Sequence, residues 1–415
     1  MNFNYINKFL FVFFLILIYS CQDSVFIQRY EIEKNRNEDQ QFDTNQINEL
    51  DFKSNETSNN YAIDFYSSQK IQTDIKTSII NKLKINNFEK SNSYDYKLNV
   101  YFNNSYIYSI NYKGEILKFN SQTGKLIQKS QIFFDSIDRN PVSFSLIDDD
   151  FIIGFKNGEI IRTSKNGIIK WRHKYDNFLN TPIKYYKNKL YVLYPDQIII
   201  LSLENGKVTF QKQYKSNNII QSNGGKITNY FNIVYFILPN GTFHSIDTLL
   251  FDDHFSNLEN LKLNNSLNNL NDQVHIYKDY LVYLDNGNTI NTFDIIENKF
   301  LIKNVSLNET DSIIFYNNIL VKKDDTYIKF FNIKNINLIK EININKLISK
   351  KSRLVKLLYI NNILYLFTDN GEIVFFDKKL NILDKVDLKI RNINNIYNYQ
   401  GKIFISTNKG FTYIF

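Results

Sequence analysis

Side chains that could hold a metal ion or transfer a proton are few in this chain and lie far apart. Its 415 residues include four histidines and one cysteine. A metal site usually shows ligands at short fixed spacings, because one element must present two of them on the same face. No two of the histidines have such a spacing; they are His173, His244, His254 and His275. The sequence therefore predicts no metal site and no catalytic residue.

Two short acidic segments are the other candidates for chemistry. Asp252-Asp253-His254 could attract a cation, and we interpret it as a polar loop. Asp148-Asp149-Asp150 leads directly into the apolar run 151–154. We interpret it as a turn and not as a pair of carboxylates for acid–base catalysis. The chemistry-bearing side chains thus favour a binding or structural protein over an enzyme.

The elements that carry these residues are short strands joined by tight turns at a nearly constant spacing. Eight turns are separated by 44, 39, 44, 46, 38, 46 and 39 residues, counted from the second residue of each pair. A period near forty with an apolar strand on each side of the turn is typical of a β-propeller. The turns are Lys113-Gly114, Asn157-Gly158, Asp196-Gln197, Asn240-Gly241, Asn286-Gly287, Asp324-Asp325, Asn370-Gly371 and Lys409-Gly410.

The first repeat shows how each unit is built. The strand 106–110 runs into Lys113-Gly114, and the strand 115–119 leads to a second turn at Thr123-Gly124 and a further strand. Glycine suits these turns because they need a positive φ, and asparagine tolerates the same geometry. With one strand supplied upstream, each repeat gives four strands, or one blade. The glycines expected to shape the turns are Gly114, Gly124, Gly158, Gly167, Gly206, Gly241, Gly287, Gly371 and Gly410.

This unit resembles the pyrroloquinoline-quinone-like propeller repeat, in which an aromatic residue follows the second glycine by four positions. Trp171 and Phe210 hold that place, whereas Gln128 replaces the aromatic in the first repeat. We interpret Trp171 as a packing residue between blades and not as a stacking platform for a ligand. The fourth to sixth repeats depart further, and Asn298 and Asn335 stand roughly where the second glycine would be.

The last repeat is one strand short. Only residues 411–415 follow Gly410, so the final blade would keep an unpaired apolar edge, which invites aggregation. The segment Ser78 to Asn86, with Ile79, Leu83 and Ile85 on one face, is the best candidate for the missing strand. We therefore expect an all-β fold over residues 76–415: an eight-bladed β-propeller of four-stranded antiparallel blades, closed by an N-terminal strand that completes the last blade.

The residues before the propeller have the composition of an export signal and a tether. Residues 1–20 contain Lys8 and an apolar run of ten from Phe9, which is typical of a signal peptide. Cys21 follows at the position that lipidation requires in the bacterial lipoprotein box; an ordinary signal peptide beside a stray cysteine is the alternative. Residues 21–75 are polar and are predicted to form a largely disordered tether, with room for a short docked strand at 61–66.

The net charge of +8 is spread along the chain. The densest group of cations is expected to lie in a solvated loop, and a patch for an acidic partner or a lipid headgroup is the alternative. Nucleic acid is not an expected partner of an exported protein. The cations of this group are Lys346, Lys350, Lys351, Arg353 and Lys356.

Lipoprotein box, polar tether and eight-bladed propeller together resemble the BamB family of outer-membrane lipoproteins. The resemblance implies a monomeric, non-enzymatic scaffold on the periplasmic face of the outer membrane. It would bind the POTRA domains of BamA and the rest of the BAM complex, assist insertion of barrel proteins and need no cofactor. Another periplasmic ligand- or protein-binding propeller is the competing class. Quinone-dependent dehydrogenases share the propeller but resemble one another in regular tryptophan motifs, whereas this chain has one tryptophan.

Overall fold

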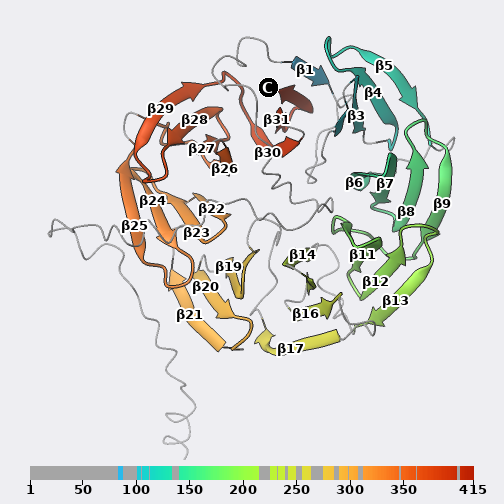
Figure 1. Ribbon diagram of the computed structural model, residues 1–415, viewed down its shortest axis with the longest axis horizontal. Helices are drawn as coiled ribbons and strands as arrows, with labels where there is room; N and C mark the ends of the chain where they lie inside the picture. Colours follow the sequence, from blue (N-terminus) through green and yellow to red (C-terminus); the bar gives the residue numbers. More distant parts are fainter. Residues whose placement is uncertain are drawn as a thin grey trace, which may run out of the picture.

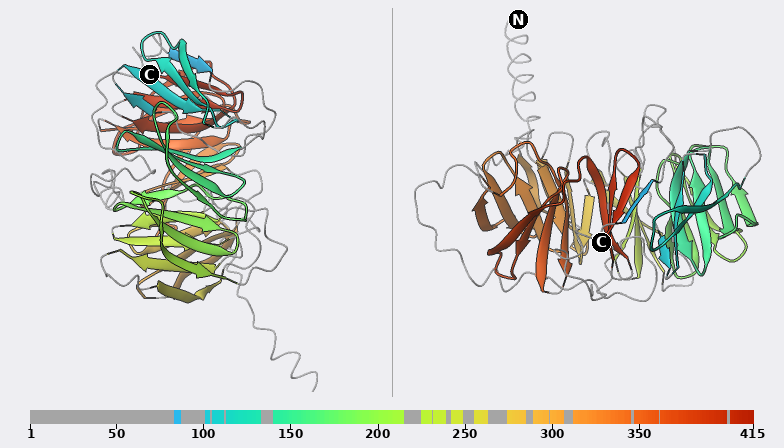
Figure 2. Two further views of the ribbon diagram at one scale, coloured as in Figure 1. Left: turned by 90° about the vertical axis from the view of Figure 1, so that its right-hand side faces the viewer. Right: turned by 90° about the horizontal axis from the view of Figure 1, so that it is seen from above.

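The computed structural model is a ring of eight four-stranded antiparallel sheets around a central axis, and the part of the chain that it describes contains no helix (Figure 1). Seen from the side, the ring is a disc with two rims (Figure 2). The described residues are 83–86, 101–103, 105–111, 113–132, 140–214, 225–230, 232–238, 242–248, 255–262, 274–284, 289–297, 299–306, 312–344, 347–360, 362–399 and 402–415.

Each blade takes four strands, named A to D from the axis outwards. Blade 1 contains β2 (Tyr101–Asn103), β3 (Tyr106–Ile110), β4 (Ile116–Asn120) and β5 (Leu126–Ser130), and blade 2 contains β6 (Pro141–Ile147), β7 (Asp150–Phe155), β8 (Glu159–Ser164) and β9 (Ile169–Lys174). Blade 3 contains β10 (Lys184–Tyr186), β11 (Lys189–Tyr194), β12 (Gln197–Ser202) and β13 (Val208–Gln213), and blade 4 contains β14 (Lys226–Tyr230), β15 (Ile233–Ile237), β16 (Thr242–Asp247) and β17 (Phe255–Lys262).

The second half of the ring repeats the plan. Blade 5 contains β18 (Val274–Tyr277), β19 (Tyr280–Leu284), β20 (Thr289–Asp294) and β21 (Lys299–Ser306), and blade 6 contains β22 (Ser312–Tyr316), β23 (Ile319–Lys323), β24 (Tyr327–Asn332) and β25 (Leu338–Asn343). Blade 7 contains β26 (Leu354–Ile360), β27 (Ile363–Thr368), β28 (Glu372–Phe376) and β29 (Ile382–Asp387), and blade 8 contains β30 (Ile393–Tyr399), β31 (Lys402–Thr407), β32 (Phe411–Ile414) and β1 (Leu83–Asn86).

The fold predicted from the turns is confirmed, including the way the ring closes. β1 pairs antiparallel with β32, from Leu83 opposite Ile414 to Asn86 opposite Phe411. The first described strand is therefore strand D of the last blade, and it covers the edge that β32 would otherwise expose. The predicted segment also included residues 78–82, which lie outside the described residues.

The hydrophobic core is divided among the interfaces between blades. One cluster joins blades 8, 1 and 2, and six more join each following pair of blades. Strands B and C are buried on both faces, as β7 shows, because each face packs on a neighbouring blade. Strand D is the outermost strand, and most residues of β9 are exposed. A chain of this length thus buries its apolar residues without needing one large core.

Two families of loops define the two rims. The B–C turns and the connections between blades lie on one, which we call the BC rim. The A–B and C–D turns lie on the other, which we call the CD rim. Backbone hydrogen bonds fasten each rim: Tyr175 N–H donates to Gly158 O at 3.2 Å on the BC rim, and Leu203 N–H donates to Asn188 O at 3.1 Å on the CD rim.

Seven of the nine expected glycines lie among the described residues, and all seven have positive φ. Gly114 (79°) and Gly158 (86°) are in B–C turns, and Gly124 (67°) and Gly206 (69°) are in C–D turns. The others are Gly167, Gly371 and Gly410. Gly241 and Gly287 lie outside the described residues.

In blades 6 and 7 the corresponding C–D position is not glycine. Ile336 has φ of 53° and Leu380 has φ of 59°. Ile336 N–H donates to Asn332 O at 2.8 Å, the same bond that Gly124 N–H makes to Asn120 O at 2.9 Å. The residue in the place of the second glycine is therefore Ile336, one position after the predicted Asn335. Asn298 lies outside the described residues.

Candidate functional surface

The described histidines lie in three different blades. His173 is half-buried on β9 and burial lowers its pKa. His244 is buried on β16 beside the ring of Tyr214, and burial together with the charge of Lys212 lowers its pKa to about 4. His275 on β18 contacts Asn317 O through Nε2 at 2.7 Å. Among the described residues no group of His, Cys, Asp and Glu could hold a metal ion. His254 and its two preceding aspartates lie outside those residues.

The acidic segment at 148–150 has a structural role. Asp148 and Asp149 have φ of 48° and 70° and form the A–B turn of blade 2. Asp150 is buried at the start of β7, where its Oδ2 lies 2.7 Å from both Arg162 Nε and Lys170 Nζ. A buried carboxylate needs such partners, since an unpaired charge is strongly disfavoured in the interior. The segment is thus a turn followed by a buried ion pair.

Trp171 packs between blades 2 and 3, as the sequence pattern indicated. Its side chain belongs to the core cluster of that interface, and Nε1–H donates to Leu203 O at 2.8 Å. The ring lies over the C–D turn of blade 3, where a Cβ on Gly206 would lie 2.6 Å from it. The indole N–H is hydrogen-bonded and the ring is buried between the blades, so neither is open to a ligand.

The densest group of cations lies on the BC rim. Lys350, Lys351 and Arg353 are exposed in the connection between β25 and β26. Lys356 is half-buried within β26, and Lys346 lies outside the described residues. Three of the five residues predicted to form a solvated loop are therefore on one loop of this rim.

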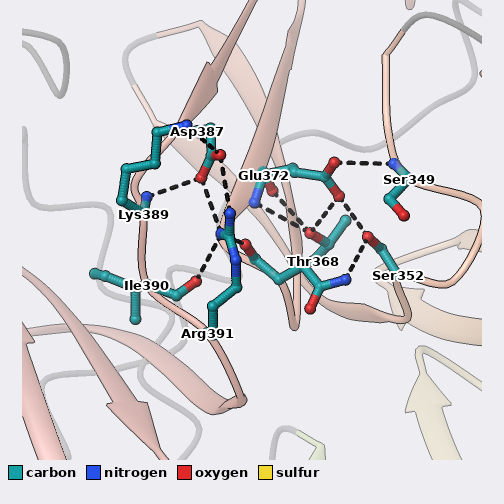
Figure 3. Close-up of polar contacts among 9 residues, drawn as sticks. Ser349, Ser352, Thr368, Glu372, Asp387, Lys389, Ile390 and Arg391 are labelled. Atoms are coloured by element: carbon teal, nitrogen blue, oxygen red, sulfur yellow. Dashed lines mark hydrogen bonds and ion pairs between the residues drawn. The ribbon is translucent and has the colours of Figure 1, made fainter.

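That loop is held in place by Glu372, the first residue of β28 (Figure 3). Its carboxylate accepts hydrogen bonds from Ser349 N–H at 2.9 Å, from the Ser352 hydroxyl and from Thr368 Oγ1 at 3.3 Å. Asn370 Nδ2 donates to Ser352 Oγ at 3.0 Å. The connection between blades 6 and 7 is thus fixed to the B–C turn of blade 7.

A second carboxylate organises the next connection in the same way (Figure 3). Asp387 accepts bonds from Arg391 Nη1 at 3.0 Å and Nη2 at 3.1 Å, and from Lys389 Nζ at 2.9 Å. The hydrogen bonds from Arg391 hold the pKa of Asp387 well below its usual range. Arg391 Nη1 also donates to Asn370 O. Two adjacent connections are therefore both tied to the same B–C turn.

This arrangement suits recognition of a macromolecule. The carboxylates are occupied as acceptors, while the Arg391 and Lys389 side chains remain about half and three-quarters exposed. Loops whose geometry is fixed before binding lose little entropy on association. Sequence reasoning missed Glu372, Asp387 and Arg391. A signal existed for the first, because a glutamate follows the B–C glycine in blades 1, 2 and 7 as Glu115, Glu159 and Glu372.

Within the described residues, no helix is long and apolar enough to cross a membrane.

The geometry defines an eight-bladed β-propeller with a polar, preorganised rim. No family model and no curated protein matches the chain. Among solved structures, BamB from Moraxella catarrhalis is similar with a TM-score of 0.56 and 11% sequence identity, covering 80% of this chain and 97% of that one. The computationally designed Ika8 protein is similar with a TM-score of 0.55 and 16% identity, covering 76% of this chain and 94% of that one. At these identities the likeness establishes the shared fold.

Proposed function

We propose that this chain is a lipid-anchored, non-enzymatic scaffold of the outer-membrane β-barrel assembly machinery, which binds BamA through its POTRA domains. Two observations support the proposal: the fold resembles BamB over nearly the whole length of that protein, and Cys21 comes shortly after an apolar run of ten residues that begins at Phe9. The fold alone does not choose this function, since a designed protein is about equally similar.

The BC rim of blades 6 to 8 supports a scaffold role. Its loops are fixed by Glu372 and Asp387, and it presents exposed Arg353, Lys389 and Arg391. The described histidines occupy separate blades, and the Asp150 carboxylate forms an ion pair with Arg162 inside the fold. Those features favour a binding surface over a reaction centre.

The test is an affinity purification of the tagged full chain from detergent-solubilised membranes. We expect BamA to be recovered with the wild-type chain and to be lost or reduced in a Cys21→Ser variant that reaches the periplasm. Recovery of the intact propeller without BamA would contradict the scaffold role. Mass spectrometry of the mature N-terminus tests the lipid on Cys21 separately, and a spectral titration with quinone and calcium tests the enzymatic alternative.

A further inference from the structure

The exposed aliphatic side chains gather on one rim. Among the described residues, nine large apolar side chains are exposed, and eight of them lie in a C–D turn or in the first two residues of strand D. In blades 1 to 3 they are Leu126, Ile127, Ile168, Ile169 and Val208, at matching places after the C–D glycine. The exception is Phe178, in the connection between blades 2 and 3 on the BC rim.

The other side of the ring continues this pattern. Ile296 is exposed in the C–D turn of blade 5, and Ile382 and Leu383 are exposed at the start of β29 in blade 7. Individual exposed fractions on this rim run from 38% to 71%. Single exposed aliphatic side chains are ordinary on a protein surface. Here they recur at the same place in five blades, at the C–D turn or the start of strand D, which a random scatter over the surface would not produce.

Lysines are interleaved with these aliphatic residues. Exposed lysines occur in the described C–D turns or at the start of strand D in six blades. Carboxylates occur in three of those turns, as Glu204, Glu297 and Asp377, and in the A–B turns of blades 2 and 5, as Asp148, Asp149 and Asp279. The lysines include Lys125, Lys207, Lys334 and Lys379, together with Lys170 and Lys299, which pair with Asp150 and Glu297. Aliphatic side chains flanked by cations are the composition of proteins that lie on anionic lipid.

The N-terminal segment enters the propeller from this rim. β32 runs from the B–C turn at Phe411 to Ile414 at the opposite rim, and Leu83 pairs with Ile414. β1 therefore begins at the CD rim, so the chain enters the propeller from that rim and not from the BC rim. A chain anchored upstream would bring the CD rim toward the membrane first.

We propose that the CD rim rests on an anionic phospholipid surface, with its aliphatic side chains among the headgroups and its lysines on the phosphates. A fluid surface suits this rim better than a protein does, because the aliphatics are spread around the ring. A protein interface concentrates its apolar contacts in one packed centre. The inference rests on the proposed function only in placing the chain beside a membrane.

The experiment uses the full chain with Cys21→Ser and one new cysteine at a time. Ile168→Cys, Ile296→Cys and Leu383→Cys each carry a polarity-sensitive fluorophore, and Phe178→Cys is the matched control on the BC rim. With vesicles of phosphatidylethanolamine and phosphatidylglycerol, we expect a blue shift and at least a twofold rise in emission at the three CD-rim sites, and no change at residue 178. Reversing Lys125, Lys207 and Lys379 to glutamate should weaken vesicle binding at least tenfold.

Three results would overturn the inference. One is vesicle binding without a shift at the CD rim, which would mean that the N-terminal segment binds alone. Another is an equal shift at residue 178. The third is a shift caused by purified BamA periplasmic domains and not by vesicles, which would assign the rim to a protein. A failed BamA purification together with positive vesicle shifts would reject the proposed scaffold role and leave the lipid contact standing.

Discussion

The interface between blades 2 and 3 and the interface between blades 6 and 7 solve the same packing problem in opposite ways. Trp171 and Lys340 hold equivalent places in strand D, each next to a β-bulge that shifts the register. Trp171 lies over Gly206 in the next blade, whose turn has no side chain at that point. Lys340 lies beside the turn of Leu380, whose side chain is fully buried in the core between the two blades.

The difference shows that the two blades share the space at their interface, so that a bulky side chain on one blade is matched by a smaller residue on the other. Where the earlier blade supplies a large ring, the next turn supplies glycine; where it supplies a slender lysine, the turn supplies leucine. The left-handed backbone is kept in both, although it is unfavourable for leucine by roughly 1–2 kcal/mol. Burying the Leu380 side chain offsets that strain, since full burial of a leucine contributes about 1.5–3 kcal/mol.

Removing the large ring should have the largest effect. Trp171→Ala should lower the free energy of unfolding by about 4 kcal/mol, because it leaves a cavity over Gly206 and removes the bond to Leu203 O. Urea denaturation followed by circular dichroism measures this. Trp171→Phe is the control and should lose clearly less; equal losses for the two variants would show that the ring does not fill the space.

Leu380 tests whether burial offsets the strained backbone. Leu380→Ala should cost about 3 kcal/mol, since it removes a buried side chain and keeps the positive φ. Leu380→Gly should cost about 1 kcal/mol less than Leu380→Ala, which reverses the usual order of the two substitutions. Thermal unfolding of both variants decides the point, and a glycine variant less stable than the alanine variant would contradict the account.

Gly206 tests the other half of the exchange. Gly206→Ala should cost about 2 kcal/mol, because the new Cβ would approach the Trp171 ring to 2.6 Å at a φ of 69°. Since Trp171 is the only tryptophan, its fluorescence should report the displaced ring directly. Combined with Trp171→Ala, the substitution should cost clearly less than alone, and strict additivity would argue against direct contact.

Ile336 should give a smaller effect than Leu380. It has the same left-handed backbone but is only half-buried against the core between blades 5 and 6. In Ile336→Gly, relief of strain should nearly cancel the lost packing, so we expect a change in unfolding free energy within about 1 kcal/mol of zero. Ile336→Ala, which keeps the strain, is the matched comparison and should be the less stable variant in the same urea titration.

Lys340 should matter least. Its Nζ donates to Lys379 O at 3.1 Å and to Asn381 Oδ1 at 2.7 Å, and both contacts are exposed to solvent. Lys340→Met keeps the aliphatic stem, so we expect a loss of about 0.5 kcal/mol or less. A loss comparable to that of Trp171→Ala would mean that the ammonium group, and not volume, holds this interface together.

The same comparison explains what the sequence could predict. The glycine turns, the eight units and the strand that closes the ring follow from local rules of backbone conformation and from the need to pair every edge. The second turns of blades 6 and 7 could not be predicted from these rules. Ile336 and Leu380 adopt the positive φ that the turn requires, and contacts with another blade stabilise them there. Such contacts are not visible in a single repeat, which is why Asn335 was the better candidate from sequence.

The candidate surface was less predictable for a related reason. Its cations form a dense group in the sequence, so Lys350, Lys351 and Arg353 could be found. Their supports could not, since Ser352 and Glu372 are 20 residues apart and meet only when a connection folds onto the next B–C turn. Asp387 and Arg391 are only four residues apart, but Asp387 ends a strand and Arg391 lies in the following loop. No single helix or strand period therefore predicts that they meet.

The pairing of β1 with β32 also sets the order in which the molecule can be assembled. During synthesis β1 emerges before every other described strand, and its partner emerges after all of them. Until then the chain can form blades but not a ring, and closing so long a loop adds an entropic barrier. The protein therefore reaches its final shape only after translation has passed Ile414, and until then its blades form an open arc whose two end blades lack a neighbour.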